Sequence, residues 1–200
     1  MIDYKKLLQE NRPLWKKRWS EGGNVDNLHQ ICGLDDWDYD IIIDWIIKNK
    51  PKTIVEYGSG ESTFIIQTLL DLMDYEYNLF SYENQKNWYD KIKETEFDKN
   101  NVVNLVECVP LVTEVAGKKF QGCRYNHSYE NIPKPDLVII DGPDLRIFDP
   151  VLDTTINLKE MFEFYNTDTI HYYIDGRRGT KNYYKYLGYE HLNIENGYNS

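Results

Sequence analysis

The sequence lacks the features that mark several classes of protein. It has three cysteines in 200 residues, at 32, 108 and 123, and no Cys-x-x-Cys spacing. An odd and unclustered set of cysteines indicates neither a disulfide framework nor a zinc site. No apolar run is long enough to cross a membrane, and the first residues lack the apolar core of a signal peptide. These absences predict a soluble, cytoplasmic protein with reduced thiols and no membrane partner.

Basic residues are also scarce, since 23 Lys and Arg stand against 33 Asp and Glu, which gives a net charge of −10. Nonspecific attraction to nucleic acid depends on dense positive charge, so no nucleic-acid partner is expected. Local basic groups occur at 16–18, at 118–124 and at 177–181, and they serve either a small anionic substrate or a solvated surface. Self-association into a homo-oligomer stays open.

The apolar pattern alternates short strands with helices. Strands are expected at 53–57, 77–82, 102–108, 137–140 and 169–174, and helices at 4–19, 35–47, 62–73 and 85–94. This alternation predicts an α/β fold, in which an open, doubly wound and mostly parallel sheet carries helices on both faces. Ligands of such sheets bind beyond the carboxyl ends of the strands.

We expect the 200 residues to form a single domain, with a helical segment over 1–50 and a core over 51–200. The helical segment either packs on the core or covers the site as a lid. Two stretches depart from the even spacing. The segment 109–136 is either a hairpin over the site or a loop-rich crossover, and the weakly alternating segment 189–194 suggests a last edge strand.

The turn after the first strand, Glu56-Tyr57-Gly58-Ser59-Gly60-Glu61-Ser62-Thr63, opens a helix. Its glycines allow a sharp turn and a close approach of a ligand, and the helix offers N–H groups to an anion. A dinucleotide fingerprint would have a third glycine where Thr63 stands. The carboxylates of Glu56 and Glu61 would also repel a pyrophosphate. S-adenosylmethionine suits the turn better because it has no phosphate. Glu56 would face its ammonium group, and the helix would meet its carboxylate.

An acid at the end of the second strand would accept hydrogen bonds from the ribose hydroxyls. Glu83 lies 23 residues after Gly60, close to the spacing of about 20 that such sites use, although a cap of the next helix is the alternative. The predicted cofactor-binding residues are Glu56, Tyr57, Gly58, Ser59, Gly60, Ser62, Thr63, Glu83 and Asp141.

Four motifs in order carry a resemblance: VEYGSGEST at 55–63, SYEN at 81–84, PDLVIIDGP at 135–143 and YYIDGRR at 172–178. They resemble the successive motifs of class I S-adenosylmethionine-dependent methyltransferases, and most of all the small enzymes that act on sugars or small metabolites. The resemblance spans roughly 36–189. It implies a Rossmann-like sheet of order 3-2-1-4-5 with extra antiparallel strands, and methyl transfer as the reaction.

Methyl transfer to a hydroxyl needs a group that removes its proton. Asp141 and Asp144 follow the fourth strand, and Asp175 follows the fifth. Because neighbouring strands lie about 4.8 Å apart, Asp141 and Asp175 could share one site and hold Mg²⁺. Some related sugar and catechol methyltransferases use a metal there, but Gly176 stands where they carry a second acid or an amide. Without a metal, Asp141 or Asp144 is the expected base, and for Asp141 the capping of a turn is the alternative role.

Three further residues are candidates near the acceptor. Arg177 and Arg178 could recognise an acidic sugar or a phosphate through bidentate hydrogen bonds, or form surface salt bridges. His127 lies in the irregular segment after the third strand and could approach the acceptor.

These patterns predict an S-adenosylmethionine-dependent O-methyltransferase that modifies a hydroxyl of a glycan, a sugar or a small metabolite. Two alternatives stay open. A nicotinamide-dependent oxidoreductase of Rossmann type would use the same turn and the same ribose acid, and a noncatalytic Rossmann-like module would bind a ligand without turnover.

Overall fold

A computed structural model describes residues 3–8, 34, 36–94, 98 and 100–198 of the chain. Residues 4–8 are helical, as expected for the start of the first predicted helix. The rest of that helix, the basic group at 16–18 and Cys32 lie outside the described residues. The proposed lid therefore stays a prediction.

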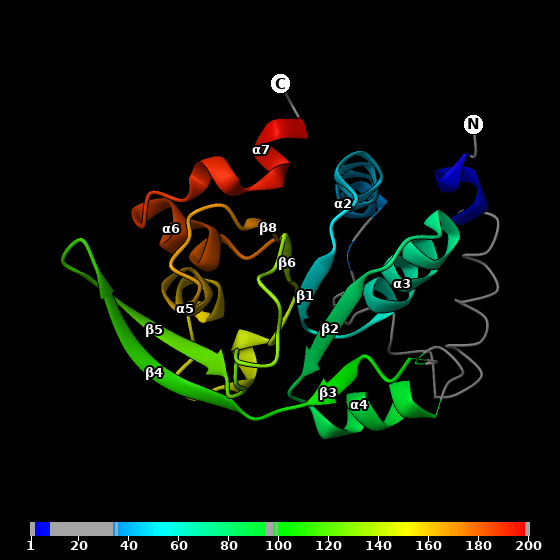
Figure 1. The fold of residues 1–200 in the computed structure, drawn as a ribbon. Helices are drawn as coiled ribbons and strands as arrows, with labels where there is room; N and C mark the ends of the chain where they lie inside the picture. Colours follow the sequence, from blue (N-terminus) through cyan, green and yellow to red (C-terminus); the bar gives the residue numbers. More distant parts are fainter. Residues whose placement is uncertain (1–2, 9–33, 35, 95–97, 99, 199–200) are drawn as a thin grey trace.

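Five parallel strands form the central sheet, in the order β3-β2-β1-β6-β8 (Figure 1). The strands are β1 (Thr53–Tyr57), β2 (Asn78–Glu83), β3 (Val103–Leu105), β6 (Leu137–Ile140) and β8 (His171–Ile174). Every residue of β1 and β6 is buried, as expected for central parallel strands covered on both faces. The predicted α/β fold, doubly wound and of order 3-2-1-4-5, is confirmed when the strands of this sheet are counted along the chain.

Helices cover both faces of this sheet (Figure 1). Successive strand residues point to opposite faces, so Ile54 packs in the cluster with α2, α3 and α7, whereas Val55 packs in the cluster with α5 and α6. The helices are α2 (Asp36–Asn49), α3 (Glu61–Met73), α4 (Lys86–Lys93), α5 (Asn157–Phe164), α6 (Arg178–Tyr186) and α7 (Ile194–Tyr198). Helix α4 lies beside β3 at the sheet edge, where Ile92 packs against Val103.

A second, smaller sheet covers the face that carries α5 and α6. Its strands β4 (Cys108–Val115) and β5 (Lys118–Tyr125) form a long antiparallel hairpin, and β7 (Thr154–Thr155) pairs with β5 in parallel. From Val109 to Val115, less exposed residues of β4 alternate with exposed ones, and Leu111 and Val115 pack at the core cluster on this side, which Cys108 joins at the start of the strand. The segment 109–136 is therefore a hairpin rather than a loop-rich crossover, and the expected extra antiparallel strands form a sheet of their own.

Two predicted strands differ from the structure. The strand expected over 102–108 ends at Leu105, because the chain leaves β2 and enters the hairpin at Cys108. The edge strand expected over 189–194 was wrong. A short 3-10 helix, η3 (Glu190–Leu192), and the start of α7 occupy that stretch, and a single bridge joins Asn193 to Tyr172. The Asn193 side chain instead accepts the Glu195 N–H, which starts the last helix.

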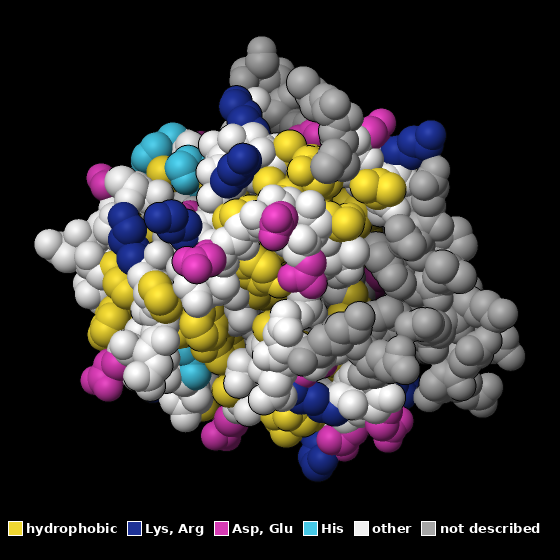
Figure 2. All heavy atoms as spheres, turned by 45° about the vertical axis from the view of Figure 1, so that its right-hand side comes forward, with side chains coloured by type: hydrophobic (Ala, Val, Ile, Leu, Met, Phe, Trp, Pro, Cys, Tyr) yellow, Lys and Arg dark blue, Asp and Glu magenta, His cyan; other side chains and the backbone are white. Residues whose placement is uncertain are grey.

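The surface agrees with the scarcity of basic residues. On the face that Figure 2 shows, the described Lys and Arg side chains stand singly or in pairs among acidic and hydrophobic ones. Every helix in the described part of the chain is too short or too polar to cross a membrane.

Candidate functional site

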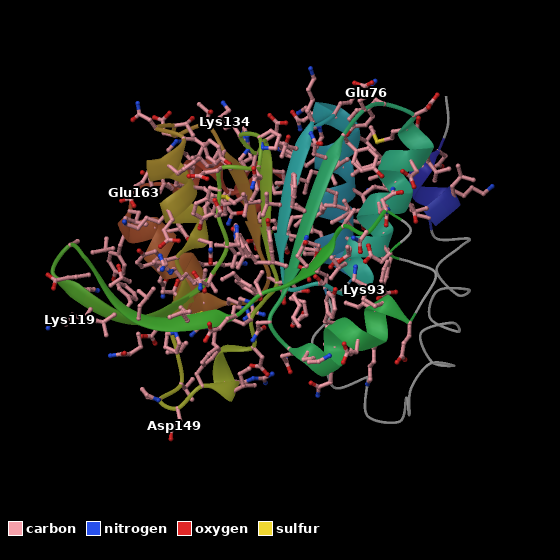
Figure 3. All side chains as sticks on the ribbon, turned by 60° about the horizontal axis from the view of Figure 1, so that its bottom comes forward. Glu76, Lys93, Lys119, Lys134, Asp149 and Glu163 are labelled. Atoms are coloured by element: carbon pink, nitrogen blue, oxygen red, sulfur yellow. The ribbon has the colours of Figure 1, made fainter. Side chains whose placement is uncertain are left out.

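The carboxyl ends of the five strands define one edge of the molecule. Figure 3 gives its direction: Glu76 and Lys134, which precede β2 and β6, lie at one end, and Asp149, in the loop after β6, lies at the opposite end. The predicted site residues follow β1, β2, β6 and β8, and His127 follows β5. The fold therefore gathers most of them at this edge, as expected for a doubly wound sheet.

Two glycines in the turn after β1 have different roles. Gly58 has a φ of +95°, and a Cβ on it would lie 2.4 Å from the backbone nitrogen of Gly142 in the loop after β6. Only glycine fits there, because the turn is left-handed and the two loops touch. Gly60 is extended, and a Cβ on it would meet nothing within 4 Å. The turn thus leaves open space at Gly60, at the start of α3.

Glu56 is the hub of this turn. Its carboxylate has no exposed surface and accepts hydrogen bonds from the hydroxyls of Ser62, Ser81 and Thr63, with distances of 2.6 Å for the first two. Burial raises its pKa, and the three hydroxyls lower it in part. Thr63 also accepts the Gly60 N–H at 3.0 Å. In this conformation Glu56 fixes the turn and does not face a ligand ammonium group, which differs from the role expected for it.

The remaining hydroxyl of the turn is also engaged. Ser59 lies 2.6 Å from Ser81, hydroxyl to hydroxyl, and its carbonyl oxygen accepts a hydrogen bond from the indole nitrogen of Trp88 at 2.7 Å. Trp88 belongs to α4, so this bond ties the helix at the sheet edge to the glycine turn. What the turn presents to a ligand is therefore its backbone.

Glu83 ends β2 beside this turn and is 4% exposed. One carboxylate oxygen accepts the N–H groups of Asn84 and Gln85 at 2.8 and 2.7 Å. Burial raises its pKa to about 7, and these hydrogen bonds counteract the rise. Glu83 is therefore held in one orientation at the point where the sequence predicts a ribose acid, and its charge changes near neutral pH.

Tyr57 and His127 belong to an aromatic cluster behind the turn. The Tyr57 hydroxyl lies 2.9 Å from Nε2 of His127, whose ring stacks on Tyr82 with centroids 4.0 Å apart. Nδ1 of His127 lies 3.2 Å from the carbonyl oxygen of Ser128, so this nitrogen carries the proton and Nε2 accepts from Tyr57. Burial lowers the His127 pKa. With both ring nitrogens engaged, His127 supports the turn from the hairpin rather than approaching an acceptor as expected.

The acids after β6 and β8 do lie together. Ile140 pairs with Ile174, so Asp141 and Asp175 are neighbours one residue further on. The Asp141 side chain is 9% exposed, and its Oδ1 has no hydrogen-bond partner among the described residues. Burial raises the Asp141 pKa well above its usual value, the Asp175 carboxyl raises it further, and Arg177 lowers it. Burial and the neighbouring carboxyl therefore favour the protonated form of Asp141.

Arg177 is not free for a substrate, contrary to the expectation from the sequence. Its guanidinium donates to the carbonyl oxygens of Asp141 and Pro143, and Nη2 is 3.9 Å from Oδ1 of Asp141. Arg178 begins α6 and is exposed. Of the two arginines, Arg178 alone keeps the predicted freedom to meet an anion.

Asp144 has a structural role that weakens it as a base. Its side chain accepts the backbone N–H of Arg146 at 3.1 Å, at the start of the 3-10 helix η2 (Leu145–Ile147), and pairs with the Arg146 guanidinium at 2.8 Å. Arg146 lowers the Asp144 pKa, which makes the carboxylate a poorer proton acceptor. Turn capping, which is the alternative role that the sequence suggests for Asp141, is instead the role of Asp144.

The predicted Mg²⁺ site does not fit these residues. Among the described residues, no group of three or more His, Cys, Asp or Glu side chains is arranged to hold a metal ion. Asp141 and Asp175 supply two carboxyls, and the Arg177 guanidinium already brings a positive charge beside them. The positive charge of that guanidinium opposes a second cation at the pair.

Sequence reasoning missed Tyr125, at the end of β5. Its hydroxyl is buried, has no hydrogen-bond partner among the described residues, and would lie 2.4 Å from a Cβ on Gly142. Burial raises its pKa, the charge of Glu83 raises it further, and Arg177 lowers it. No pattern in the sequence links a hairpin residue to this edge.

Comparisons with known proteins give distant similarities only. No model of a known protein family matches the sequence, and a search of curated proteins found no match. Among solved structures, a methyltransferase of Podospora anserina with bound SAH is 15% identical, with a TM-score of 0.49 over 88% of this chain and 62% of that one. A Staphylococcus aureus protein, provisionally described as a caffeoyl-CoA O-methyltransferase, is 15% identical, with a TM-score of 0.41 over 82% of this chain and 66% of that one. The chain thus spans less than two thirds of the length of either, and neither similarity is close enough to transfer a function.

Proposed function

We propose that this protein is an S-adenosylmethionine-dependent O-methyltransferase. The observation that carries the proposal is the turn at the end of β1: Gly58 folds it tightly, Gly60 leaves open space at the start of α3, and Glu83 lies at the adjacent strand end. A small ligand with a carboxylate at one end and a ribose at the other matches this arrangement.

The residues present fit this cofactor better than a dinucleotide. A side chain at Gly60 would fill the open space, and the first turn of α3 directs N–H groups toward an anion there. Glu83, when ionised, accepts hydrogen bonds from ribose hydroxyls. Glu56 and Glu83 are both buried beside the turn. When ionised, they would repel the negative charge of a pyrophosphate. When bound, S-adenosylmethionine supplies an electrophilic methyl group.

The acid pair after β6 and β8 is the proposed proton acceptor. Burial raises the Asp141 pKa, so its ionised form is a stronger proton acceptor than an ordinary aspartate. Ionised Asp141 takes the proton of the acceptor hydroxyl, and Arg177 holds the loop of Asp141 through the carbonyl oxygens of Asp141 and Pro143. Asp144 and His127 are poorer candidates for this step, for the reasons given above.

The acceptor class is the finer part of the proposal. We infer a hydroxyl of a glycan, a sugar or another small metabolite, with Arg178 available to meet an acidic group. The enzyme would act as a single domain in the cytoplasm, and residues 1–50 would contribute to covering the site.

Calorimetric titration with S-adenosylmethionine, S-adenosylhomocysteine and NADH tests the proposal. We expect micromolar binding of the first two and none of NADH. Gly60→Arg should abolish this binding with stability unchanged, since the new side chain enters open space, and Gly60→Ala is the matched control that should still bind. Binding of NADH alone would favour the oxidoreductase, and no binding at all would reject the assignment of the turn.

A screen of methyl acceptors follows if the cofactor binds. Asp141→Asn should then lower the turnover rate and leave the affinity for S-adenosylmethionine within a few-fold. Full activity of that variant would remove Asp141 from the mechanism. Cofactor binding without methyl transfer to any acceptor would instead favour the noncatalytic module.

A further inference from the structure

The acid pair at the ends of β6 and β8 carries a charge problem. Asp141 and Asp175 are neighbours because Ile140 and Ile174 pair in the sheet. The Asp141 side chain is 9% exposed, and its Oδ1 is buried without a hydrogen bond from any described residue. A buried carboxylate such as that of Asp141, with a second carboxyl beside it, requires a nearby positive charge or must stay protonated.

Arg177 provides that charge in an unusual way. Its guanidinium is 16% exposed and is held by two backbone acceptors, the carbonyl oxygens of Asp141 and Pro143, which both belong to the loop after β6. Nη2 is 3.9 Å from Oδ1 of Asp141, which is an ion pair without a hydrogen bond, and Nε is buried without a partner among the described residues. The backbone bonds fix the guanidinium in place, so its charge is directed at the acids.

The other basic side chains near this loop are engaged elsewhere or point away. Arg146 pairs with Asp144, Lys181 pairs with Glu195 at 2.6 Å, and Arg178 is exposed. Within the described residues, Arg177 is therefore the basic group that faces Asp141. Because a guanidinium stays protonated at any pH a protein tolerates, this charge is permanent.

We propose that Arg177 is a resident cation that occupies the place of a divalent ion at the Asp141–Asp175 pair. It neutralises the pair and repels a metal ion, so the two acids act without one. Removing the guanidinium leaves two adjacent carboxyls at a strand end, which is the ligand set to which Mg²⁺ or Mn²⁺ binds together with water. In the proposed methyltransferase, Arg177 is then a positioning residue that acts through the two acids.

Titration with Mn²⁺, followed by electron paramagnetic resonance, tests this proposal without any methyl donor. We expect no stoichiometric binding to the wild-type protein up to about 1 mM, the weak end of protein sites for such ions. Arg177→Ala should bind one Mn²⁺ at least about tenfold more tightly than the wild type, and Arg177→Ala with Asp175→Asn should lose that gain. Arg178→Ala is the matched control, since it removes an equal charge one residue away and should behave as the wild type.

Arg177→Lys keeps a positive charge but not the guanidinium that donates to the carbonyl oxygens of Asp141 and Pro143, and it should not gain the Mn²⁺ site. This variant therefore distinguishes the effect of the charge from the effect of these hydrogen bonds. A folded Arg177→Ala and a folded Arg177→Gln that both fail to bind Mn²⁺ would overturn the proposal. So would a wild-type protein that binds one Mn²⁺ and loses it on Asp141→Asn. If the Arg177 variants are folded but less stable than the wild type, millimolar Mg²⁺ should raise their melting temperature. The absence of such a rise would also reject the proposal. A failure of the methyltransferase assignment would appear separately, as wild-type protein that does not bind S-adenosylmethionine.

Discussion

The two halves of the carboxyl edge differ in how completely their buried polar atoms are hydrogen-bonded. In the turn half, which here means Glu56, Gly58, Ser59, Gly60, Ser62, Thr63, Ser81, Glu83 and Trp88, the carboxylate of Glu56 receives three hydroxyl hydrogen bonds and Trp88 ties α4 to the turn. In the acid half, which comprises Asp141, Asp175, Arg177 and Tyr125, three buried polar atoms have no hydrogen-bond partner among the described residues.

Under the proposed function, this difference would assign cofactor binding to the turn half and methyl transfer to the acid half. Fully paired buried networks are rigid, and a rigid turn binds a cofactor without having to reorganise. Buried polar groups left without partners cost stability, and they are retained where a ligand or a reaction supplies the missing partner. The hydrogen bonds around Glu56 are therefore complete without a ligand, whereas under the proposed function a ligand would supply the missing partners of the acid half.

The largest expected effect tests how rigid the turn half is. Gly58→Ala forces a side chain into a left-handed turn and against the backbone of Gly142, at 2.4 Å. We expect a loss of about 4 kcal/mol in the free energy of unfolding, as the sum of backbone strain and overpacking. Urea unfolding measures it, with Gly60→Ala as the control that should change stability by less than about 0.5 kcal/mol. Equal effects of the two variants would contradict the different roles given to these glycines.

A second prediction uses the titration of Glu83. Its pKa in the folded protein is raised to about 7, above the value of about 4.3 in the unfolded chain, so the native state favours the protonated form. Its contribution to stability is present below about pH 4.3 and is lost as the pH rises to about 7. Over that window the wild type should lose about 3 kcal/mol relative to Glu83→Gln. Unfolding of both proteins at several pH values gives the difference, and parallel pH profiles would show that Glu83 does not titrate as described.

The link between α4 and the turn half gives a smaller effect. Trp88→Phe keeps an aromatic ring at this position and removes the 2.7 Å hydrogen bond from the indole nitrogen to the Ser59 carbonyl. We expect a loss of about 1 kcal/mol in stability and weaker cofactor binding by a few-fold. Thermal unfolding and calorimetry measure the two quantities. An unchanged affinity together with lower stability would confine Trp88 to structure.

The smallest effect is expected in the acid half, and with the opposite sign. Asp175→Asn removes the carboxyl that repels Asp141 and leaves Arg177 to pair with Asp141 alone. We expect stability to stay the same or to rise by up to about 1 kcal/mol at pH 7, because the substitution removes the repulsion that helps to raise the Asp141 pKa. Chemical denaturation decides the sign. A clear loss of stability would mean that the acid half is as fully paired as the turn half, and the comparison would fail.

Sequence patterns predicted the central sheet well because its strands are buried on both faces. β1 and β6 begin and end at the predicted residues, since continuous apolar runs bounded by Pro, Gly and Asp leave little freedom. The weakly patterned segment 189–194 failed because its alternation is equally compatible with a short helix, and the Asn193 cap decided between them. The strand β7 is two residues long, too short for any period to reveal.

The site was predicted by position better than by role. Strand-end location follows from topology, so Glu83, Asp141 and Asp175 lie at the ends of β2, β6 and β8 as expected, while their roles stay predictions. Hydrogen-bond partners depend on packing between distant segments, which no spacing encodes. Arg177 was therefore expected to meet a substrate and instead binds the loop after β6, and Tyr125 reaches the edge through a hairpin whose path the sequence left open.

The contact between Gly58 and Gly142 limits how this protein can change. Each residue already lacks a side chain, and each would clash with the other's backbone if it gained one. If either glycine were replaced by a larger residue, the other could not be made smaller to compensate. This pair therefore offers no path by which new specificity can evolve through single substitutions. Variation in what the protein recognises has to arise in the parts that surround this contact, the hairpin β4–β5 and the loop over 144–153, where exposed side chains such as Val112 and Val151 are free to differ.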